Sequence, residues 1–502
     1  MICNEHLKEA LCLAPCLAAL FNECLRQGSI PTSWRDALLT VIPKGKGDPL
    51  DPSAWRGIAR KSCCYKLLAS ILTDRLSLFL DFVHCIPEEQ HGFRANRSTY
   101  SACSQLLDHI RNTLRRPRQF LYAVFIDFRA AFDTAPRHAA LEKLGRAGVP
   151  PTFLELIRSI LQEGSIIIDD GNAELEPFVQ TTGVAQGDNL SPLLFNVVIS
   201  DLPHFIKGRH PQIDLLLYAD DLVIFSHSRF HLQQALATMC VYLDSLGLEI
   251  NLAKTEAMKF RRGGRLAATD SIHLGGSEVR FVNHFTYLGV TIPSNGVSFG
   301  QHIDERSRKA MIASVGIEHP QKLSLNTALA LFDLKISPTA CYGIPLIWDS
   351  LTVNQLERLD RVKPSFLKRA LGLHISSPNR KVYLLCSTPL FVEQLVQRFQ
   401  LSKTVAYRKF IERYEEKMAE LEPEFFTTRA MTNDTWKGVN RTNRHAVTRF
   451  AIHGYHHMLC QVQGHHAPDD RCVCMRCGEG CSLYHGMNCA GVVSLNVLAN
   501  AP

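Results

Sequence analysis

The alternation of apolar and polar positions predicts a chain in which helices and short strands are mixed. Near the N-terminus, Leu13, Leu17, Phe21 and Leu25 recur at helical spacing. This periodicity predicts an amphipathic helix packed on a core. Charged residues precede this stretch and Pro15 interrupts it, which argues against a secretory signal.

Uninterrupted apolar runs predict buried strands further along the chain. One run covers residues 120–128, and two more, 213–218 and 222–226, flank Ala219-Asp220-Asp221. The paired runs predict a hairpin with acidic residues at its tip. Helices are expected from about Pro136 and near Ser191-Pro192, since proline suits the first turn of a helix. From about 300 to 450 the pattern is mainly helical.

Composition indicates a folded protein of several packing units. The chain has 502 residues, of which 46% are hydrophobic and 21% charged, which favours two to four units over one. A net charge of +7 is compatible with nucleic acid as a partner, but many unrelated enzymes carry as much. The 17 cysteines are spread and odd in number, which indicates buried thiols in a reducing compartment, with one terminal cluster apart. No apolar run is long enough to span a membrane.

Carboxylates stand where predicted strands end. Asp127 closes the first strand, and Asp220-Asp221 interrupts the apolar hairpin. Unpaired carboxylates beside a core repel each other and are costly to desolvate, so they need a counter-charge. Two Mg²⁺ ions could supply it and promote phosphoryl transfer. The alternative is that these acids lie in solvated turns, which we prefer for Asp133 as a helix-entry residue.

Ordered blocks of residues resemble the reverse transcriptases of non-LTR (LINE-type) retrotransposons over about residues 20–290. The third block is Tyr218-Ala219-Asp220-Asp221, a short string that alone would be weak. The blocks together are specific because of their order. They lie at 31–44, 55–58, 89–98, 125–133, 183–196, 218–221, 246–256 and 287–290.

The resemblance implies roles for individual residues. The metal ligands would be Asp127, Asp220 and Asp221, holding two Mg²⁺ ions, with Mn²⁺ as a substitute. The incoming nucleotide would be bound by Lys44, Arg56, Phe132, Gln186, Gly187 and Lys254. The template backbone would be contacted by Gly92, Phe93, Arg94 and Arg97.

Chemistry is consistent with these roles but leaves alternatives. Lys44 and Arg56 would offset charge on the triphosphate, or else be solvated loop cations. Phe132 would exclude a ribose 2′-hydroxyl, or else pack in the core. Gly187 would allow close backbone approach, and Lys254 would protonate or neutralise the leaving pyrophosphate.

A cysteine-rich cluster lies near the C-terminus. Cys474, Cys477, His485 and Cys489 have intervals of two, seven and three residues, compatible with one tetrahedral Zn²⁺. They resemble the C-terminal CCHC knuckle of non-LTR elements. We expect a structural zinc site that engages RNA or DNA; the alternative is a loose cysteine-rich tail.

The expected architecture is a mixed α/β (α+β) right-hand polymerase. Fingers would cover 1–120, an antiparallel palm sheet 121–292, a helical thumb and connection 293–450, and the zinc knuckle 451–502. Lys61 departs from the resemblance, because relatives usually have an apolar residue there.

The implied reaction is RNA-directed DNA synthesis from a primer 3′-hydroxyl, with an RNA template, a DNA primer or target site and dNTPs as partners, and no membrane. The resemblance implies intracellular, nuclear action in target-primed synthesis, with endonuclease activity supplied by a missing domain or another protein. The alternative is a truncated or domesticated relative that binds nucleic acid without catalysis.

Overall fold

The computed structural model describes residues 4–10, 12–45, 48–162, 164–169, 176–264 and 270–419, which fall into two compact units. Among these residues, the first unit comprises those up to Leu288 with Pro293–Gly296, and the second comprises Gly289–Ile292 and Val297–Ala419. The division falls close to residue 292, where the sequence suggested that the palm ends. The predicted fingers and palm share the first unit.

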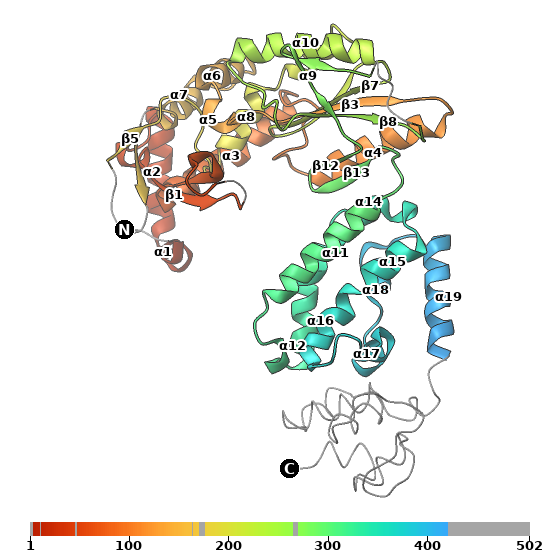
Figure 1. The fold of residues 1–502 in the computed structure, drawn as a ribbon. Helices are drawn as coiled ribbons and strands as arrows, with labels where there is room; N and C mark the ends of the chain where they lie inside the picture. The colour runs from red at the N-terminus through yellow and green to blue at the C-terminus, as the bar shows by residue number, and fades with distance from the viewer. Residues whose placement is uncertain are drawn as a thin grey trace, which may run out of the picture. The chain divides into compact units, whose positions relative to one another are not determined.

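A five-stranded sheet forms the centre of the first unit, in the order β11-β8-β3-β7-β6 (Figure 1). β3 pairs antiparallel with β7 and β8, and β7 pairs antiparallel with β6, so the expected antiparallel palm sheet is confirmed. Every residue of β3 is buried, because helices cover both faces of the sheet. The strands are β3 (Leu121–Ile126), β6 (Asp214–Tyr218), β7 (Asp221–Ser226), β8 (Glu256–Phe260) and β11 (Arg280–Phe281).

The two faces of this sheet pack against different elements. Leu222 and Ile224 belong to the main core, together with Leu232 and Leu236 of α10. Phe225 points the other way and contacts His109 of α4 edge-to-face, with ring centroids 5.0 Å apart. Alternate residues of a strand face opposite sides, so Asp221 shares the face of Phe225.

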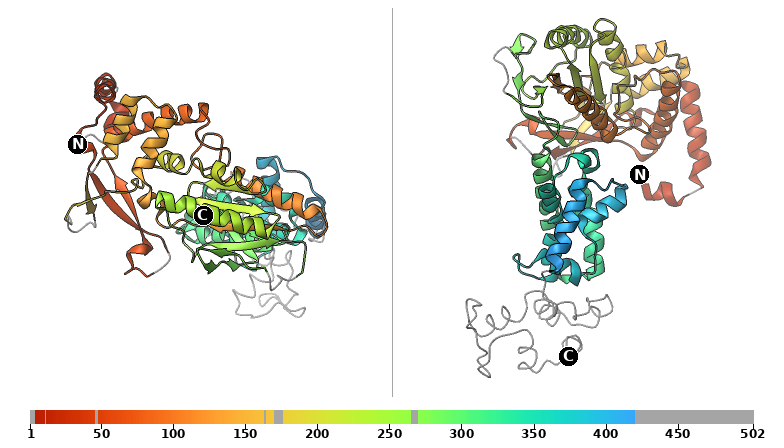
Figure 2. Two further views of the ribbon diagram at one scale, coloured as in Figure 1. Left: turned by 90° about the horizontal axis from the view of Figure 1, so that it is seen from above. Right: turned by 90° about the vertical axis from the view of Figure 1, so that its right-hand side faces the viewer.

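A second sheet lies in the N-terminal part of the unit, in the order β2-β1-β4-β5. β1 pairs antiparallel with β2 and parallel with β4. Strands β4 and β5 therefore complete a sheet that β1 and β2 begin more than 100 residues earlier in the chain (Figure 2). The sequence analysis did not predict this pairing. The strands are β1 (Ala37–Pro43), β2 (Trp55–Arg60), β4 (Ser165–Asp169) and β5 (Phe178–Val179).

Ten α-helices surround these sheets in the described part of the first unit. The predicted N-terminal amphipathic helix is confirmed as α2, which buries Phe21 and Cys24 and ends at Gly28 in the left-handed region. The helices are α1 (Asn4–Glu9), α2 (Leu13–Gln27), α3 (Cys63–Phe82), α4 (Thr99–Arg115), α5 (Ala131–Thr134), α6 (Arg137–Arg146), α7 (Pro151–Ile160), α8 (Ser191–Val198), α9 (Leu202–Lys207) and α10 (Arg229–Leu246), with short 3₁₀ turns η1 (Thr32–Trp34) and η2 (Pro52–Ala54).

Short strands end the first unit and lead into the second. β9 (His273–Leu274) pairs with β10 (Ser277–Glu278), and β12 (His284–Tyr287) pairs with β13 (Val290–Pro293). Phe285 of β12 stacks on Phe125 of β3 with ring centroids 4.0 Å apart, which fixes β12 to the palm sheet.

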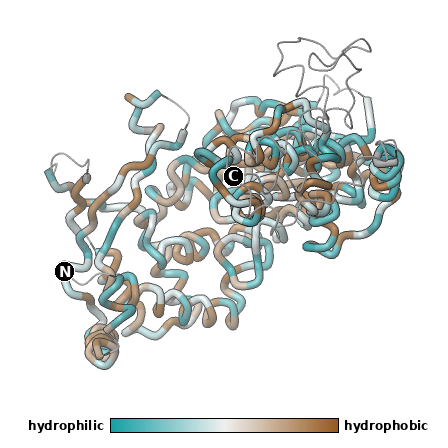
Figure 3. Tube along the Cα trace, turned by 90° about the horizontal axis from the view of Figure 1, so that it is seen from below, coloured by the Kyte–Doolittle hydropathy of each residue, from teal (hydrophilic) through white to brown (hydrophobic). Residues whose placement is uncertain are grey.

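From Val297 to Ala419 the regular elements of the second unit are helices, as the sequence predicted for this region. Phe332 packs against the rings of Phe366 and Phe391 at its core. Figure 3 shows that hydrophilic and hydrophobic positions are mixed along the chain. The elements are α11 (Gly300–Val315), η3 (Pro320–Lys322), α12 (Leu325–Leu331), η4 (Phe332–Ile336), α13 (Ser337–Cys341), α14 (Ile344–Ile347), η5 (Trp348–Ser350), α15 (Val353–Asp360), α16 (Val362–Leu371), α17 (Asn379–Leu385), α18 (Phe391–Phe399) and α19 (Val405–Ala419).

Two expectations concern features beyond these elements. In the part of the chain that the structure describes, no helix combines the length and apolar character needed to cross a bilayer. The predicted zinc ligands Cys474, Cys477, His485 and Cys489 lie outside the described residues, as does the predicted knuckle region 451–502.

Candidate active site

The strand register brings the predicted acidic residues to one edge of the palm sheet. Ile126 pairs with Leu222, so Asp127, the next residue after β3, emerges beside Asp221 at the start of β7. Tyr218 pairs with Asp221, so Ala219 and Asp220 form a two-residue turn between β6 and β7. Two adjacent strands therefore end in carboxylates, as the sequence predicted.

Burial and charge repulsion raise the pKa values of Asp220 and Asp221. Restricted solvation and the negative charges of Asp220 and Asp127 raise the pKa of Asp221 to about 6. Although part of Asp221 is exposed, its two acidic neighbours make ionisation unfavourable. Burial and the charge of Asp127 also raise the pKa of Asp220, while the cations Lys254 and Arg56 oppose that shift.

Lys254 is held close to Asp127 by the segment that precedes β8. The backbone N–H of Asn251 donates to the carbonyl of Asp127 at 2.7 Å, and Phe128 forms an antiparallel bridge with Ile250. This pairing leaves the Lys254 Nζ atom 3.4 Å from Asp127 Oδ2. Lys254 is 68% exposed on its side chain, so it remains accessible to a ligand.

A buried glutamine clamps the acidic turn in place. Gln90 Oε1 accepts hydrogen bonds from the backbone N–H groups of Gly92 at 2.8 Å and Ala219 at 2.9 Å. Asn196 of α8 donates to the Gly92 carbonyl at 2.8 Å. Ala219 has a φ of 53°, an uncommon value for a residue with a side chain, and these bonds stabilise it. The sequence analysis missed Gln90 and Asn196 as supports of the turn.

Gly92 must lack a side chain for this contact to form. A Cβ added at Gly92 would overlap the backbone nitrogen of Ala219 and lie 3.0 Å from the carbonyl carbon of Tyr218. The resemblance assigned Gly92 to the template. The structure places it directly against the acidic turn.

Residues 42–292 match the family described as "Reverse transcriptase (RNA-dependent DNA polymerase)". The chain belongs to the reverse transcriptase family. Membership confirms the right-hand polymerase fold class that the sequence indicated, with its mixed α/β character and antiparallel sheet.

Related reverse transcriptases come from retrotransposable elements, as the sequence resemblance implied. A probable RNA-directed DNA polymerase from transposon BS of Drosophila melanogaster is 26% identical over 374 residues, covering 71% of this chain and 41% of the relative. The RNA-directed DNA polymerase from mobile element jockey of the same species is 24% identical, covering 71% and 40%. The Pol polyprotein from the R2 element of Popillia japonica is 27% identical, covering 72% and 51%. The chain thus spans about half or less of these curated relatives.

Solved structures of telomerase are also similar. Apo telomerase from Candida Tropicalis aligns with a TM-score of 0.42 and 13% identity, covering 82% of this chain and 72% of that one. Telomerase from Candida albicans in complex with a TWJ fragment of telomeric RNA aligns with a TM-score of 0.37 and 13% identity, covering 77% and 68%.

The loop that the family resemblance assigns to the nucleotide lies against the second sheet. The Ala59 N–H of β2 donates to the Gln186 carbonyl at 2.8 Å. Gly187 has a φ of 98°, and a Cβ there would lie 3.0 Å from Ile58 Cγ2. Gly187 therefore permits a close approach between this loop and β2.

Asp133 lies in the first turn of α5, as predicted for a helix-entry residue, and it also joins this group of contacts, which the sequence analysis did not predict. Gln186 hydrogen-bonds to Asp133, and the charge of Lys44 acts on the same carboxyl. Burial is nevertheless the largest influence and raises the pKa of Asp133. Lys44 and Gln186, both predicted nucleotide contacts, thus converge on one acidic residue of α5. Their spacing of 142 positions left no local signal of this contact.

Phe132 packs partly in the core, which is one of the two interpretations that the sequence left open. It is half-buried, and its ring stacks on that of buried Phe195 with centroids 5.2 Å apart. Core packing therefore holds one side of Phe132. A contact with the sugar of a nucleotide stays a prediction.

The residues predicted to contact the template differ in how they are held. Arg94 donates to Asp81 at 2.9 Å and to the Pro87 carbonyl at 2.8 Å, and only 10% of its side chain is exposed. Arg97 likewise pairs with Glu88. Phe93 is 53% exposed beside Tyr218, with ring centroids 6.5 Å apart. The ion pairs of Arg94 and Arg97 therefore stabilise this loop. Phe93 presents an exposed aromatic ring on it.

The acidic residues supply the type of ligand atom that Mg²⁺ prefers, but they do not form a complete coordination shell by themselves. Among the residues that the structure describes, no three His, Cys, Asp or Glu side chains are arranged to hold a metal by themselves. Mg²⁺ commonly takes only one or two carboxylates and completes its shell with substrate phosphates and water. Asp127, Asp220 and Asp221 provide only oxygen ligands, and their mutual repulsion favours a cation.

Proposed function

We propose that this chain is an RNA-directed DNA polymerase that extends a primer 3′-hydroxyl in target-primed reverse transcription of a non-LTR retrotransposon. The observation that carries the proposal is the crowding of Asp127, Asp220 and Asp221 at one sheet edge, with the pKa of Asp221 raised to about 6. Relatives named as RNA-directed DNA polymerases and the family match support it. The partners would be an RNA template, a DNA primer and dNTPs.

In this mechanism the primer 3′-hydroxyl releases its proton to water and its oxygen attacks the α-phosphorus of the dNTP. A new phosphorus–oxygen bond forms, and the bond to pyrophosphate breaks. Two bound Mg²⁺ ions would supply Lewis acidity for the attacking and leaving oxygens. The ions would be held by Asp127, Asp220 and Asp221. By holding them, these carboxylates would orient the primer hydroxyl and the triphosphate. Lys254, close to Asp127, would neutralise or protonate the pyrophosphate.

Other residues would bind the nucleotide and the template. Arg56 acts electrostatically on Asp220, and its guanidinium would offset charge on the triphosphate. The Gln186-Gly187 backbone would line the pocket, and Phe132 would exclude a 2′-hydroxyl. Phe93 would stack with or support a template base near Tyr218.

Primer extension on poly(rA)/oligo(dT) with dTTP and Mg²⁺ tests the proposal. We expect extension by the wild-type chain and none by Asp220→Ala/Asp221→Ala, with the circular-dichroism spectrum unchanged. A folded wild-type chain that binds the duplex but does not extend it would contradict the proposal. That result would favour the non-catalytic nucleic-acid-binding alternative.

We also propose one structural Zn²⁺ at Cys474, Cys477, His485 and Cys489, on the strength of their spacing. Metal analysis of the purified chain should give about one zinc per molecule, because four such ligands complete a tetrahedral site. Cys474→Ser should lose that zinc, whereas Cys12→Ser, at an exposed cysteine of the first unit, should retain it. Equal zinc in both variants would contradict the assignment.

A further inference from the structure

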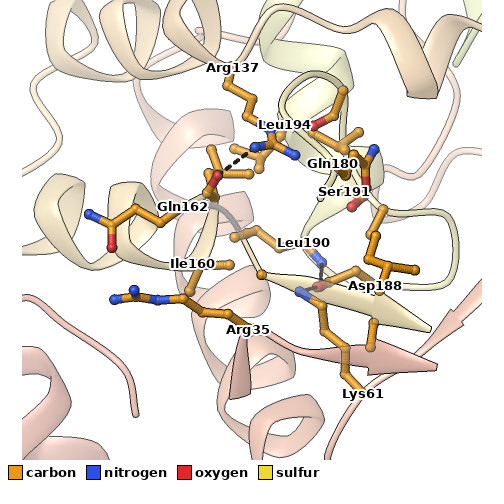
Figure 4. Close-up of a pocket in the computed structure, with 17 residues that line it drawn as sticks. Arg35, Lys61, Arg137, Ile160, Gln162, Gln180, Asp188, Leu190, Ser191 and Leu194 are labelled. Carbon is orange, nitrogen blue, oxygen red and sulfur yellow. Dashed lines mark hydrogen bonds and ion pairs between the residues drawn. The ribbon is translucent and has the colours of Figure 1, made fainter. Parts of the chain in front are cut away.

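A buried ion pair involves loop 185–190, the loop that the family resemblance assigns to the nucleotide. Lys61 Nζ is 3.2 Å from Asp188 Oδ2, and the two side chains are 10% and 4% exposed (Figure 4). The Tyr65 hydroxyl of α3 donates to the same Oδ2 atom at 2.5 Å. The Leu190 N–H donates to Asp188 Oδ1 at 3.1 Å. Both oxygens of this carboxylate therefore have protein partners.

These partners come from different parts of the fold. Lys61 follows strand β2, Tyr65 lies in helix α3, and Asp188 lies in the 185–190 loop just before α8. Asp188 is one residue beyond Gly187 and two beyond Gln186, the predicted lining of the nucleotide pocket. The network therefore ties this loop to the strand and helix that flank it on the N-terminal side.

Packing alone does not fix the inner side of the loop. A cavity of about 40 Å³ lies there, and its lining includes Lys61, Asp188, Arg35 and Arg137. That volume corresponds to roughly three water molecules. Because close packing is interrupted at this place, polar links contribute to the position of the loop beside the buried side chain of Leu190.

The pair is suited to setting a position rather than to binding substrate charge. Lys61 and Asp188 neutralise each other, and Lys61 also lies 4.5 Å from the centre of the Tyr65 ring. Removing one partner leaves a buried charge unpaired, whereas removing both charges does not.

We propose that Lys61, Tyr65 and Asp188 are positioning residues that hold loop 185–190 in the conformation that binds the incoming deoxynucleotide. This inference rests on the proposed polymerase function. None of the three residues is required to touch the substrate. Their loss should therefore act on nucleotide binding more than on the chemical step.

The test compares Lys61→Met, Asp188→Asn and the double variant in steady-state primer extension on poly(rA)/oligo(dT). Each single variant should raise the KM for dTTP about tenfold, with kcat changed by less than about threefold. The double variant should raise KM by less than the product of the two single effects, because no charge is left unpaired. Tyr65→Phe, which removes one hydrogen bond, should raise KM by about twofold to fivefold.

A matched control separates positioning from general stability. Lys259 pairs with Asp270 at 2.8 Å, and these side chains are 9% and 5% exposed, in the same unit. Lys259→Met should lower Tm to a similar extent and leave the KM for dTTP unchanged. If folded Lys61→Met, Asp188→Asn and Tyr65→Phe all kept the wild-type KM, the proposal would be overturned.

Hydrogen exchange of the backbone provides a measurement that does not need activity. Peptides covering 185–190 should exchange faster in Lys61→Met than in wild type or in Lys259→Met. Unchanged exchange there would refute the positioning role even if the wild-type chain proved inactive. Absence of extension by the wild type would count only against the proposed polymerase function.

Discussion

At the scale of single residues, Asp221 carries a charge that the folded protein disfavours without a cation. Its pKa in the folded chain is about 6, against an ordinary value of 3.8. A carboxyl with a raised pKa binds protons more tightly in the folded than in the unfolded chain. Its charge therefore destabilises the fold above pH 6, and stability returns as pH falls through 6 toward 3.8.

Asp221→Asn should therefore raise Tm in EDTA at about pH 7.5 and lose this part of the pH dependence, while abolishing primer extension. Thermal unfolding between about pH 4 and 7.5 measures both effects, because this range spans the two pKa values of Asp221. Asp244→Asn, at an exposed position on α10, serves as control and should leave Tm and activity nearly unchanged. An Asp221→Asn variant less stable than wild type would show that the carboxylate has a stabilising partner.

Tyr287 carries a second unfavourable polar group near the site. Its side chain is 3% exposed, and its hydroxyl has no hydrogen-bond partner among the described residues. Burying an unsatisfied hydroxyl costs about 1–3 kcal/mol. Burial raises the pKa of this phenol, and Cys103 and the negative charge of Asp221 raise it further.

Tyr287→Phe should raise the free energy of unfolding by about 1 kcal/mol, because it removes a buried hydroxyl and keeps the ring. Tyr122→Phe is the matched comparison, since the Tyr122 hydroxyl donates to Asp270 at 2.9 Å. That change should lower stability by about the same amount. Thermal or urea unfolding of the two variants should thus give shifts of opposite sign, and shifts of the same sign would contradict the argument.

At the scale of elements, local patterns predicted strands and turns but not the contacts that assemble them. The apolar runs and intervening acids identified β3, β6 and β7, because strand burial leaves a local signature. The parallel pairing of β1 with β4 joins residues such as Leu38 and Ile167, far apart in sequence. Gln90 and Ala219 are separated by 129 positions, and such a side chain–backbone bond has no periodic pattern. The sequence analysis identified Lys61 only as a departure from the family resemblance, because its partner Asp188 is also far away in the sequence.

The segment around Gly92 gives a test of how one element positions another. Gly92→Ala would push the added methyl group into the Ala219 nitrogen, so the acidic turn or its supporting segment must move. A displacement of about 1 Å at a reacting group costs on the order of a hundredfold in rate. We expect that loss in kcat, with a fall in stability of about 1–3 kcal/mol from overpacking.

Gly263→Ala is the control for this prediction. A Cβ at Gly263 meets nothing within 4 Å, so both activity and Tm should stay near wild type. Primer-extension kinetics and thermal unfolding of the two alanine variants provide the comparison. A Gly92→Ala variant with wild-type kcat would show that the segment does not position the turn.

At the scale of the whole molecule, the chain contains two units whose internal contacts divide near residues 288–297. The second unit includes a buried histidine whose protonation opposes folding. Thr291 N–H donates to His302 Nδ1 at 3.2 Å, and His302 Nε2 donates to the Tyr342 carbonyl at 3.0 Å. A proton on Nδ1 would face the Thr291 N–H. Burial is the main reason that the pKa of His302 is lowered to about 4.

The sign of the resulting pH dependence is opposite to that of Asp221. The unfolded histidine takes a proton as pH falls below 6.5, whereas the folded one resists protonation until about pH 4. Stability is therefore lost across this interval, by about 3 kcal/mol when the lower pH is reached. His302→Gln should reduce this acid sensitivity, because glutamine does not titrate.

Differential scanning calorimetry of the whole chain can assign this effect to one unit. We expect two unfolding transitions, because separate cores need not unfold cooperatively. His302→Gln should change the acid sensitivity of one transition, and Tyr122→Phe, at a residue of the first unit, should lower the other. Wild type compared with each variant at about pH 7 and 5 isolates the substituted group from all other titrations. If both substitutions shifted a single common transition, the two units would form one cooperative fold, and the acid response of His302 would be shared by the active-site unit.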